Sequence, residues 1–400
     1  MYTNQSRGRS FGRPRFRSRN FRTFSNRRFQ RPDSSIHEYI SRSTVQTNSI
    51  KETPEPEVRF DSLNLPQELQ QTVLRHGYSV LTPIQVTGIP AIREGKDVIG
   101  IANTGTGKTA AFIIPLIEKI LKDRTYRALV ITPTRELALQ ILEEVRKFSS
   151  GMPIYNSFCI GQSSISAQIR ELRRNPHIVV GTPGRLKDLI KRKILRLDSF
   201  KMVVLDEVDQ MLDMGFIHDI RHIVSFLPQE RQSLFFSATV STQINILIQS
   251  FVKNPITISV KKRETLEHIK QEVVKVDFGK SKLDMLSFLL TKEEFKKVLV
   301  FGRTKRGVDR ISQELFQKGF KVTAIHGDKP QHRRQQAIRM FKEDVVQVLV
   351  ATDVAARGLD VSNISHVINF DIPMTYEDYI HRIGRTGRAN KSGVALTLTE

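Results

Sequence analysis

One stretch of the chain reads Ala102-Asn103-Thr104-Gly105-Thr106-Gly107-Lys108-Thr109. Residues 97–101 before it are mostly β-branched and apolar, which predicts a strand, and the apolar run 110–121 after it predicts a helix. The glycines allow the loop to turn back and bring backbone N–H groups close to phosphate oxygens. The N-terminus of the following helix adds partial positive charge at the same place. This order of strand, glycine-rich loop and helix is typical of a phosphate-binding loop.

The loop predicts a nucleoside triphosphate and Mg²⁺ as ligands. The amine of Lys108 would bridge the terminal phosphates, and the hydroxyl of Thr109 would bind Mg²⁺. The other phosphate contacts are expected from Thr104, Gly105, Thr106 and Gly107. The loop departs from the general pattern at its first position, which holds Ala102 where glycine is usual. A glycine-rich turn without a ligand is the alternative interpretation.

An acidic segment follows another apolar strand. Residues 202–205 predict a strand that ends in Asp206-Glu207-Val208-Asp209. A carboxylate at the carboxyl end of a strand near a phosphate loop is placed to hold Mg²⁺, which indicates Asp206. Glu207 beside it is placed to orient or deprotonate a water that attacks the γ-phosphate. Without the loop, the same acids would indicate the solvated start of a helix.

The length and the strand pattern predict two domains. A chain of 400 residues exceeds the roughly 250–300 residues at which a single core stops growing. From Phe60 onward, short β-branched runs alternate with amphipathic stretches, which indicates βα units around parallel sheets. The expected strands are residues 97–101, 128–132, 177–180, 202–205, 233–236, 256–260, 297–301, 321–325, 346–350, 366–370 and 393–398. The expected divisions are a tail over 1–32, a linker over 33–59, domains over 60–260 and 273–400, and an interdomain linker over 261–272.

The net charge is unevenly distributed. It totals +22, from 63 Lys and Arg against 41 Asp and Glu, and favours a polyanionic partner. Residues 1–32 hold ten arginines, five phenylalanines and no acidic residue. Such a segment has no apolar face to bury, so it is expected to be disordered. Because Arg pairs with phosphates and Phe stacks on unpaired bases, it predicts a nucleic-acid tether, with a solubilising tail as the alternative.

The composition also limits the compartment. No window reaches the roughly 18 uninterrupted apolar residues of a membrane-spanning helix, so no membrane partner is expected. The N-terminus has no apolar signal core. The single cysteine, Cys159, excludes an internal disulfide framework and a cysteine-based zinc site. A reducing, cytoplasmic compartment and a monomer are expected, and the sequence identifies no protein partner.

From Phe60 to its C-terminus, over about 340 residues, the chain resembles the DEAD-box ATP-dependent RNA helicases of helicase superfamily 2. The loop that begins with alanine is that family's variant. The other matching motifs occur in the family's order, at residues 77–85, 133–137, 182–185, 206–209, 237–239, 351–360 and 381–388. No single motif is decisive, but a full series in the right order is highly specific.

The resemblance implies two tandem RecA-like domains with parallel sheets, ATP and Mg²⁺ as cofactors, and RNA as partner. It places the adenine against Phe60 and Gln85, and the Gln85 amide offers the donor and acceptor that an adenine edge requires. It places the ribose against Asp360. Two arginine fingers from the second domain, Arg385 and Arg388, would neutralise charge on the transferred phosphoryl group.

The same resemblance implies how RNA is bound and separated. A bent single strand would be held through its sugar–phosphate backbone, which carries affinity but little sequence information. The residues implied are Arg135, Arg185, Thr352 and Gly327. Closure of the two domains would pry apart short duplexes, and hydrolysis would reset the clamp. The residues implied in coupling these steps are Asp209, Ser237, Thr239 and His381.

The chain departs from the family in three places. Val208 replaces the usual alanine, and overpacking of this kind typically costs about 1–3 kcal/mol. Gly161-Gln162 replaces a pair of glycines before an RNA contact. The family continues with a further helix beyond Glu400, so the chain is interpreted as a fragment or a minimal core. Two other functions stay open: an RNA-binding clamp or annealing chaperone with little unwinding, and a DNA-directed helicase.

Overall fold

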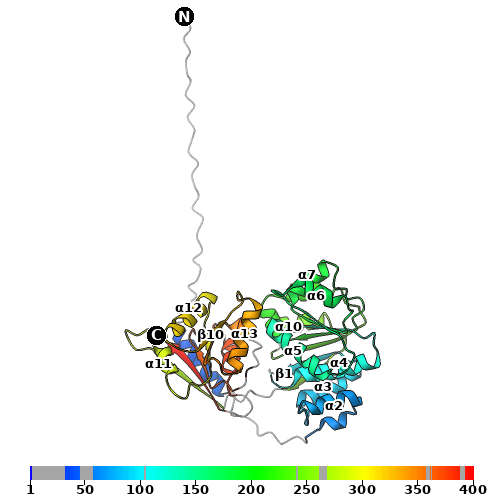
Figure 1. Ribbon diagram of the computed structural model, residues 1–400, viewed down its shortest axis with the longest axis horizontal. Coiled ribbons are helices and arrows are strands. Elements are labelled where there is room, and N and C mark those ends of the chain that lie inside the picture. Colours follow the sequence, from blue (N-terminus) through cyan, green and yellow to red (C-terminus); the bar gives the residue numbers. More distant parts are fainter. Residues whose placement is uncertain are drawn as a thin grey trace, which may run out of the picture.

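The computed structural model of the chain describes residues 1, 32–45, 57–102, 105–239, 242–260, 268–356, 361, 363–387 and 392–400. These residues form two α/β domains, shown side by side in Figure 1, each built on one sheet. The strand pairs in both sheets are parallel, as the alternating βα pattern predicts. Almost all of the expected basic tail over 1–32 lies outside the described residues.

The first domain holds a seven-stranded sheet in the order β3-β4-β2-β5-β6-β1-β7. Its strands are β1 (Val98–Ala102), β2 (Ala128–Ile131), β3 (Asn156–Cys159), β4 (Ile178–Gly181), β5 (Met202–Asp206), β6 (Gln232–Ser237) and β7 (Ile256–Val260). Its helices are η1 (Phe60–Leu63), α2 (Gln67–Arg75), α3 (Pro83–Arg93), α4 (Lys108–Lys122), α5 (Arg135–Phe148), α6 (Ile165–Leu172), α7 (Pro183–Lys191), α8 (Val208–Asp213), α9 (Ile217–Val224) and α10 (Thr242–Gln249). Alternate strand residues enter opposite cores, Val130 on one face and Leu129 on the other. Burial on both faces explains why the central strands are almost wholly apolar.

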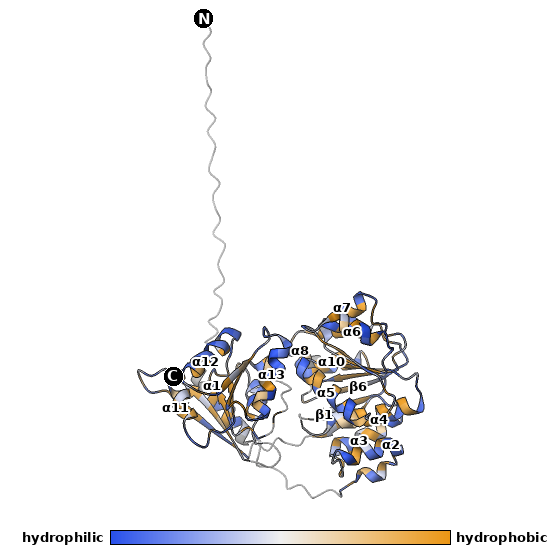
Figure 2. Cartoon of the chain, viewed as in Figure 1, coloured by the Kyte–Doolittle hydropathy of each residue, from blue (hydrophilic) through white to orange (hydrophobic). Residues whose placement is uncertain are grey.

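The second domain holds a six-stranded sheet in the order β10-β11-β9-β12-β13-β8. Its strands are β8 (Ile269–Lys275), β9 (Val298–Phe301), β10 (Val322–Ile325), β11 (Val348–Ala351), β12 (His366–Asn369) and β13 (Gly393–Thr399). Its helices are α11 (Lys282–Leu290), α12 (Lys305–Gln317), α13 (Gln331–Lys342), α14 (Asp353–Ala356) and α15 (Tyr376–Ile383). Apart from the edge strand β8, whose residues are mixed, the strands are mainly apolar, whereas the helices have apolar and polar faces (Figure 2). Each helix therefore covers the sheet with one face and meets solvent with the other.

Most of the expected ligand-binding segments follow the carboxyl ends of parallel strands, whereas residues 77–85 and 381–388 do not. In the first domain they follow β1, β2, β4, β5 and β6, and in the second they follow β11. Neighbouring strands are in register, so that Ile101 lies beside Ser237 and Ile131 beside Gly181. Because parallel strands end at the same edge of a sheet, segments far apart in sequence meet there.

The expected strands are all present, and their ends differ from the expected ones by at most two residues. Two further strands, β3 and β8, were not predicted from the sequence. The residues of β8, Ile269–Lys275, alternate between polar and apolar at the edge of the second sheet, where one side of the strand stays in solvent. This strand begins inside the interdomain linker expected over 261–272, so the second domain starts earlier than expected.

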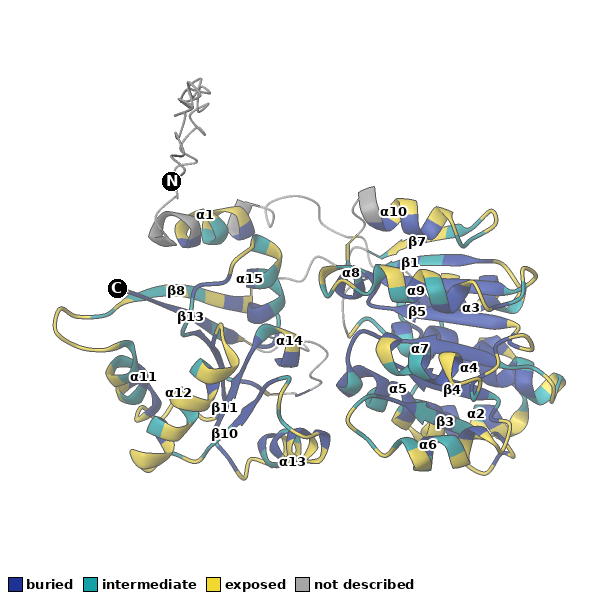
Figure 3. Ribbon diagram, turned by 90° about the horizontal axis from the view of Figure 1, so that it is seen from above, coloured by how far each residue is buried: buried dark blue, intermediate teal, exposed yellow. Residues whose placement is uncertain are grey.

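The linker expected over 33–59 also differs, because it contains most of a helix, α1 (Pro32–Val45). Ile36, Tyr39 and Ile40 recur at helical spacing and form a narrow apolar stripe. This stripe packs on the second domain, although the chain next enters the first (Figure 3). Three apolar residues among polar neighbours are a weak sequence signal for a packed helix. Their role becomes visible only from the surface of the second domain that they contact.

The described residues bear on two expectations, the absence of a membrane-spanning helix and the state of the single cysteine. Among them, no helix combines the length and apolar character needed to cross a membrane. Cys159 is free and buried at the end of β3, and burial raises the pKa of its thiol to about 12. A thiol that stays protonated is unreactive, so Cys159 acts as a small apolar core residue.

Candidate functional site

The phosphate loop connects β1 to α4 as the sequence predicts. Gly107 has φ +91°, and a Cβ there would overlap the side chains of Gln85 and Thr82, so glycine is required. Lys108 opens α4, is only 6% exposed, and its Nζ donates to the carbonyl oxygen of Ala102 at 2.8 Å. The lysine is thus held at the end of β1, within the loop that would wrap a phosphate. Thr104 lies outside the described residues.

Gln85 ties this loop to the start of α3. The backbone N–H of Thr82 donates to Gln85 Oε1 at 2.9 Å, and Gln85 Nε2 donates to the carbonyl oxygen of Gly107 at 3.0 Å. The side chain is almost completely buried. An amide has two N–H groups and two oxygen lone pairs, so one donor and one acceptor position are left for a base.

The aromatic residue that lines the nucleotide cavity is Tyr78, and the sequence analysis did not assign it a role. The cavity has a volume of about 510 Å³, and its lining includes Tyr78, Gln85, Lys108 and Glu207. Phe60 is buried behind Tyr78, with ring centroids 5.8 Å apart and edges meeting faces. Burial, followed by the nearby Glu144 carboxylate, raises the pKa of Tyr78 to about 12, so its hydroxyl stays neutral.

Asp206 ends β5 and Glu207 follows it, and both line the same cavity. Glu207 has φ +54°, a left-handed conformation that is strained for a residue with a side chain. Burial, with a smaller contribution from Asp206, raises the pKa of Glu207 to about 7, while Lys108 and Arg385 oppose the rise. Its Oε2 is buried without a hydrogen-bond partner among the described residues. A strained, buried carboxylate with a near-neutral pKa is suited to accept a proton from water.

The second domain completes the nucleotide cavity. Arg385, just after α15, and Lys342, at the end of α13, line it together with residues of the first domain. Arg385 is close enough to Glu207 for its charge to lower the pKa of that carboxyl. Of the other residues expected here, Arg388 and Asp360 lie outside the described residues.

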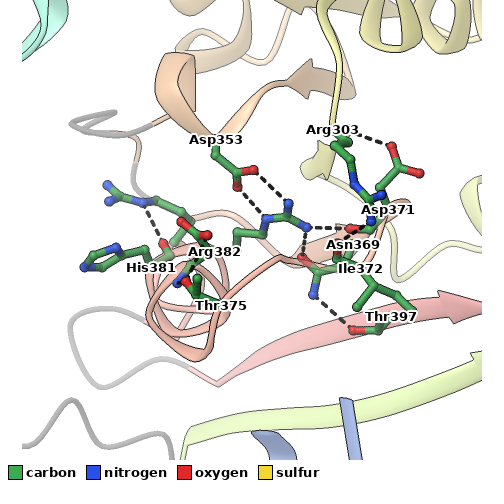
Figure 4. A network of polar contacts seen from close by, with 11 residues as sticks. Arg303, Asp353, Asn369, Asp371, Ile372, Thr375, His381, Arg382 and Thr397 are labelled. Atoms are coloured by element: carbon green, nitrogen blue, oxygen red, sulfur yellow. Dashed lines mark hydrogen bonds and ion pairs between the residues drawn. The ribbon is translucent and has the colours of Figure 1, made fainter. Parts of the chain in front are cut away.

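Arg382 holds α15 in place, and the sequence analysis did not identify it (Figure 4). Its Nε and Nη2 donate to both carboxylate oxygens of Asp353 at 2.5 and 2.8 Å. Its Nη1 donates to Asn369 Oδ1 and to the carbonyl oxygen of Asp371, and the guanidinium lies over the ring of Phe301. This 2% exposed arginine joins α15 to α14 and to the ends of β9 and β12. It therefore fixes the helix that precedes Arg385.

Asp209 links the acidic segment to the end of β6. Its Oδ2 accepts hydrogen bonds from the backbone N–H groups of Ala238 and Thr239, both at 2.9 Å, and from the Thr239 hydroxyl at 3.2 Å. The Ser237 hydroxyl accepts from the Asp209 N–H and donates to the carbonyl oxygen of Thr239. A shift of the acidic segment would move residues 237–239 with it. Val208, at the start of α8, is fully buried in the core behind this network.

A second cavity of about 430 Å³ lies between the domains. It is lined by Arg135, Gly161, Gly184, Arg185 and Gly327, and also by Met214, Phe216 and Val354, which the sequence analysis did not assign. Arg135 Nη1 donates to Gln162 Oε1, and Arg185 Nη1 donates to Gln168 Oε1 at 2.8 Å. Burial and then the charge of Arg334 lower the pKa of Arg135. Clustered, partly desolvated cations are stabilised by an anion such as a phosphate.

Two expected residues lie beside these sites. Thr352 follows β11 and is nearly buried, and its N–H donates to the carbonyl oxygen of Ile325 at 3.4 Å. His381 lies on α15 and lines a small pocket with Asp353 and Arg382. Its coupling to the acidic segment stays a prediction.

A buried contact between the domains closes one side of the second cavity. Glu136, on α5, accepts from Arg334 Nη2 at 2.7 Å and from Gln331 Nε2 at 3.1 Å, both on α13. Glu136 and Arg334 are each 5% exposed. Such an ion pair is costly to break because either partner alone would be a buried, unpaired charge. The ion pair between Glu136 and Arg334 therefore fixes how the two domains lie relative to each other at this cavity.

The fold and these cavities define a nucleotide-binding protein of two RecA-like domains, with the phosphate loop and acidic residues on one domain and an arginine from the other. Residues 82–247 match the DEAD/DEAH box helicase family. Residues 281–390 match the helicase conserved C-terminal domain. The chain belongs to the DEAD-box helicase family, as its motifs predict.

Named relatives agree with this assignment. The DEAD-box ATP-dependent RNA helicase CshA of Geobacillus kaustophilus is 48% identical over 345 residues, which cover 84% of this chain and 73% of the relative. The ATP-dependent RNA helicase CshA of Listeria monocytogenes is 49% identical over 344 residues, which cover 86% of this chain and 66% of the relative. The chain thus spans about two thirds to three quarters of the length of these relatives.

Solved structures of this family resemble both domains together. Mss116p bound to single-stranded RNA and AMP-PNP has a TM-score of 0.78 at 30% identity and covers 88% of this chain and 76% of its own. Dbp5 of S. cerevisiae bound to RNA and ADP BeF3 has a TM-score of 0.76 at 31% identity and covers 86% of this chain and 89% of its own. The likeness extends over both domains, which agrees with the expected tandem arrangement.

Proposed function

We infer that this chain is an ATP-dependent RNA helicase, in which hydrolysis of ATP is stimulated by RNA bound across both domains. One observation carries the proposal: Glu207 and Lys108 of the first domain share a cavity with Arg385 of the second. An active site divided in this way is complete only when the domains are together. Any ligand that holds the domains together therefore promotes hydrolysis.

The residues of the nucleotide cavity have distinct proposed roles. Lys108 neutralises the terminal phosphates, and Glu207 accepts a proton from the attacking water. Arg385 stabilises the charge that develops on the transferred phosphoryl group, and Arg388 is proposed to assist it. Gln85 selects adenine through its amide, with the Tyr78 ring lining the cavity and Phe60 packed behind that ring.

Mg²⁺ is proposed to be held by Thr109 and Asp206. A hydroxyl and a carboxylate are the hard oxygen donors that Mg²⁺ prefers, and they are completed by phosphates and water. Among the described residues, no three His, Cys, Asp or Glu side chains gather into a metal-binding group. That fits a Mg²⁺ that arrives with its nucleotide rather than one enclosed by the protein. When bound, Mg²⁺ neutralises charge on the β- and γ-phosphates.

RNA is proposed to occupy the second cavity through its sugar–phosphate backbone. Arg135 and Arg185 supply the charge, and the glycines Gly161, Gly184 and Gly327 allow close approach of the backbone. Backbone contacts of this kind bind without regard to sequence. A strand bent to follow both domains cannot remain paired, so domain closure would open a short duplex locally.

Two assays test this function. We expect hydrolysis of ATP to rise on addition of single-stranded RNA, and a short RNA duplex to be unwound only when ATP is present. Hydrolysis that does not respond to RNA, with RNA binding intact, would instead indicate a clamp or annealing chaperone. Equal stimulation by a DNA strand of matched sequence would indicate a DNA-directed helicase, since RNA differs in its 2′-hydroxyls.

The basic tail is proposed to act as a second RNA tether. A chain that begins at Pro32 keeps α1 but loses ten arginines. We expect it to bind RNA more weakly and with a smaller salt dependence, because fewer counterions are released on binding. Its turnover at saturating RNA should be nearly unchanged. Affinity equal to that of the full chain at every salt concentration would make the tail a solubilising segment.

We further propose that the protein acts in the cytoplasm as a monomer. A single buried, protonated cysteine requires no oxidising compartment. Sedimentation of the purified chain with and without RNA tests the monomeric state.

A further inference from the structure

The helix α1 packs on the part of the second domain that carries Arg385. Ile36 is fully buried in a cluster with Ile269, Tyr379, Ile383 and Ala395. Of these, Tyr379 and Ile383 belong to α15, Ile269 to β8 and Ala395 to β13. The two family matches cover residues 82–247 and 281–390, so neither includes α1.

Aromatic and polar contacts fix how α1 lies on this surface. The ring of Tyr39 meets the rings of Tyr376 and Tyr379 at centroid distances of 5.8 and 6.0 Å. The guanidinium of Arg42 lies 4.9 Å from the centre of the Tyr376 ring. Aromatic pairs and cation–π contacts both depend on the relative orientation of the groups, so together they select one orientation of α1.

A partly buried hydrogen-bond network joins α1, β8 and α15. Gln271 Oε1 accepts from the Ser43 hydroxyl at 2.9 Å and from the Tyr379 hydroxyl at 2.7 Å. Ser43 is fully buried, and Tyr379 is 1% exposed. Because one acceptor serves both hydroxyls, displacement of α1 would alter the surroundings of Tyr379 on α15.

The surface under α1 also supports the loop that follows α15. A Cβ on Gly387 would lie 2.6 Å from Ile269 Cγ1, so this loop passes directly against Ile269. Ile269 therefore contacts α1 and the loop that begins with Arg385. On its other side, α15 is held by the pairing of Arg382 with Asp353.

We propose that α1 is a positioning element for Arg385, and that Ile36 and Tyr39 act on ATP turnover by holding α15 and its following loop in the geometry that reaches the γ-phosphate. The inference rests on the role proposed above for Arg385. A displacement of about 1 Å at a catalytic group can cost about 10²-fold in rate, so a packing contact at this helix has catalytic consequences.

The test compares full-length variants at saturating RNA. We expect Ile36→Asp to lower kcat for ATP by about 10-fold or more, because Arg385 loses its fixed position. The KM for ATP should be unchanged, because the phosphate loop and Gln85 belong to the first domain. Ile36→Leu should restore kcat, and His37→Ala, on the exposed face of α1, should have no effect.

Hydrogen exchange separates positioning from general destabilisation. In Ile36→Asp, amides of α15 and β13 should exchange faster, whereas those of β1 and α4 should not change. Normal kcat with faster exchange in α15 would show that α1 only covers the domain, and would overturn the proposal. Unchanged exchange in α15 would overturn it as well. If Ile36→Asp does not fold, Tyr39→Ala, which removes only the ring contacts, decides by the same kcat and KM criteria.

Failure of the role proposed for α1 can be told apart from failure of the helicase assignment. An unmodified chain without RNA-stimulated hydrolysis would refute the helicase assignment, whatever α1 does. If the unmodified chain is active and the folded Ile36→Asp variant is equally active, only the role of α1 is refuted.

Discussion

Replacing Glu207 with glutamine is expected to stop ATP turnover while ATP and RNA still bind. The amide keeps the shape of the side chain but cannot accept a proton from water, and a general base contributes about 10²–10⁴-fold to rate. Phosphate release at saturating RNA measures the loss, and binding of a labelled nucleotide and RNA measures what is kept. Glu230→Gln, an exposed change of the same chemistry, is the matched control. Phosphate release equal to that of the control would refute the role of Glu207.

The pH dependence of turnover follows from the same carboxylate. The pKa of Glu207 is raised to about 7, mainly by burial, and only the ionised form can act as base. We expect kcat to rise with pH through about 7 and then to level. The folded-state pKa lies above the unfolded value, so the folded protein binds the extra proton and loses stability as pH rises across this interval. Glu207→Gln should therefore raise the free energy of unfolding at pH 8, by about 1–3 kcal/mol.

Replacing Arg385 with alanine is expected to have the other large effect. An arginine finger contributes about 10³–10⁵-fold to phosphoryl transfer, so kcat should fall by at least about 10³-fold. ATP binding should be weakened less, because Lys108 and Gln85 belong to the first domain. Single-turnover hydrolysis with RNA measures the chemical step directly. Arg310→Ala, which removes an exposed arginine of α12, is the control.

The outcome for Arg385 also tests the divided active site. Turnover close to that of the Arg310→Ala control would remove Arg385 from the site. Loss of hydrolysis together with loss of folding of the second domain would be a structural effect, and thermal unfolding of the variant shows whether it occurs. Arg385→Lys should recover part of the activity, since it restores the charge without the planar donor geometry.

Much of the fold could be predicted from residue patterns. The strands of the two parallel sheets are continuous apolar runs because both faces of each sheet are covered, and such runs are visible in a single sequence. The edge strand β8 was missed, because one of its sides stays in solvent and its residues are mixed. The helix α1 was missed for a similar reason, since its stripe of Ile36, Tyr39 and Ile40 is short.

The candidate site was predictable in its chemistry and less so in its packing. Lys108 and Glu207 could be assigned because their roles depend on local features, a glycine-rich loop and a strand end. Tyr78 and Arg382 could not, because an aromatic wall and a buried arginine anchor are defined by what lies across from them. The pairing of Arg382 with Asp353 joins segments separated in the chain, and nothing in either segment alone specifies it.

The sequence by itself determined the phosphate loop, the acidic segment and the order of motifs, because backbone geometry and side-chain chemistry within a few residues produce those features. The tertiary structure decided which distant groups meet: Arg385 with Glu207, Glu136 with Arg334, and α1 with α15. These contacts arise from burial of surfaces that the linear order does not connect. The helix that comes before the first domain therefore packs against the second, where its apolar stripe finds a matching surface.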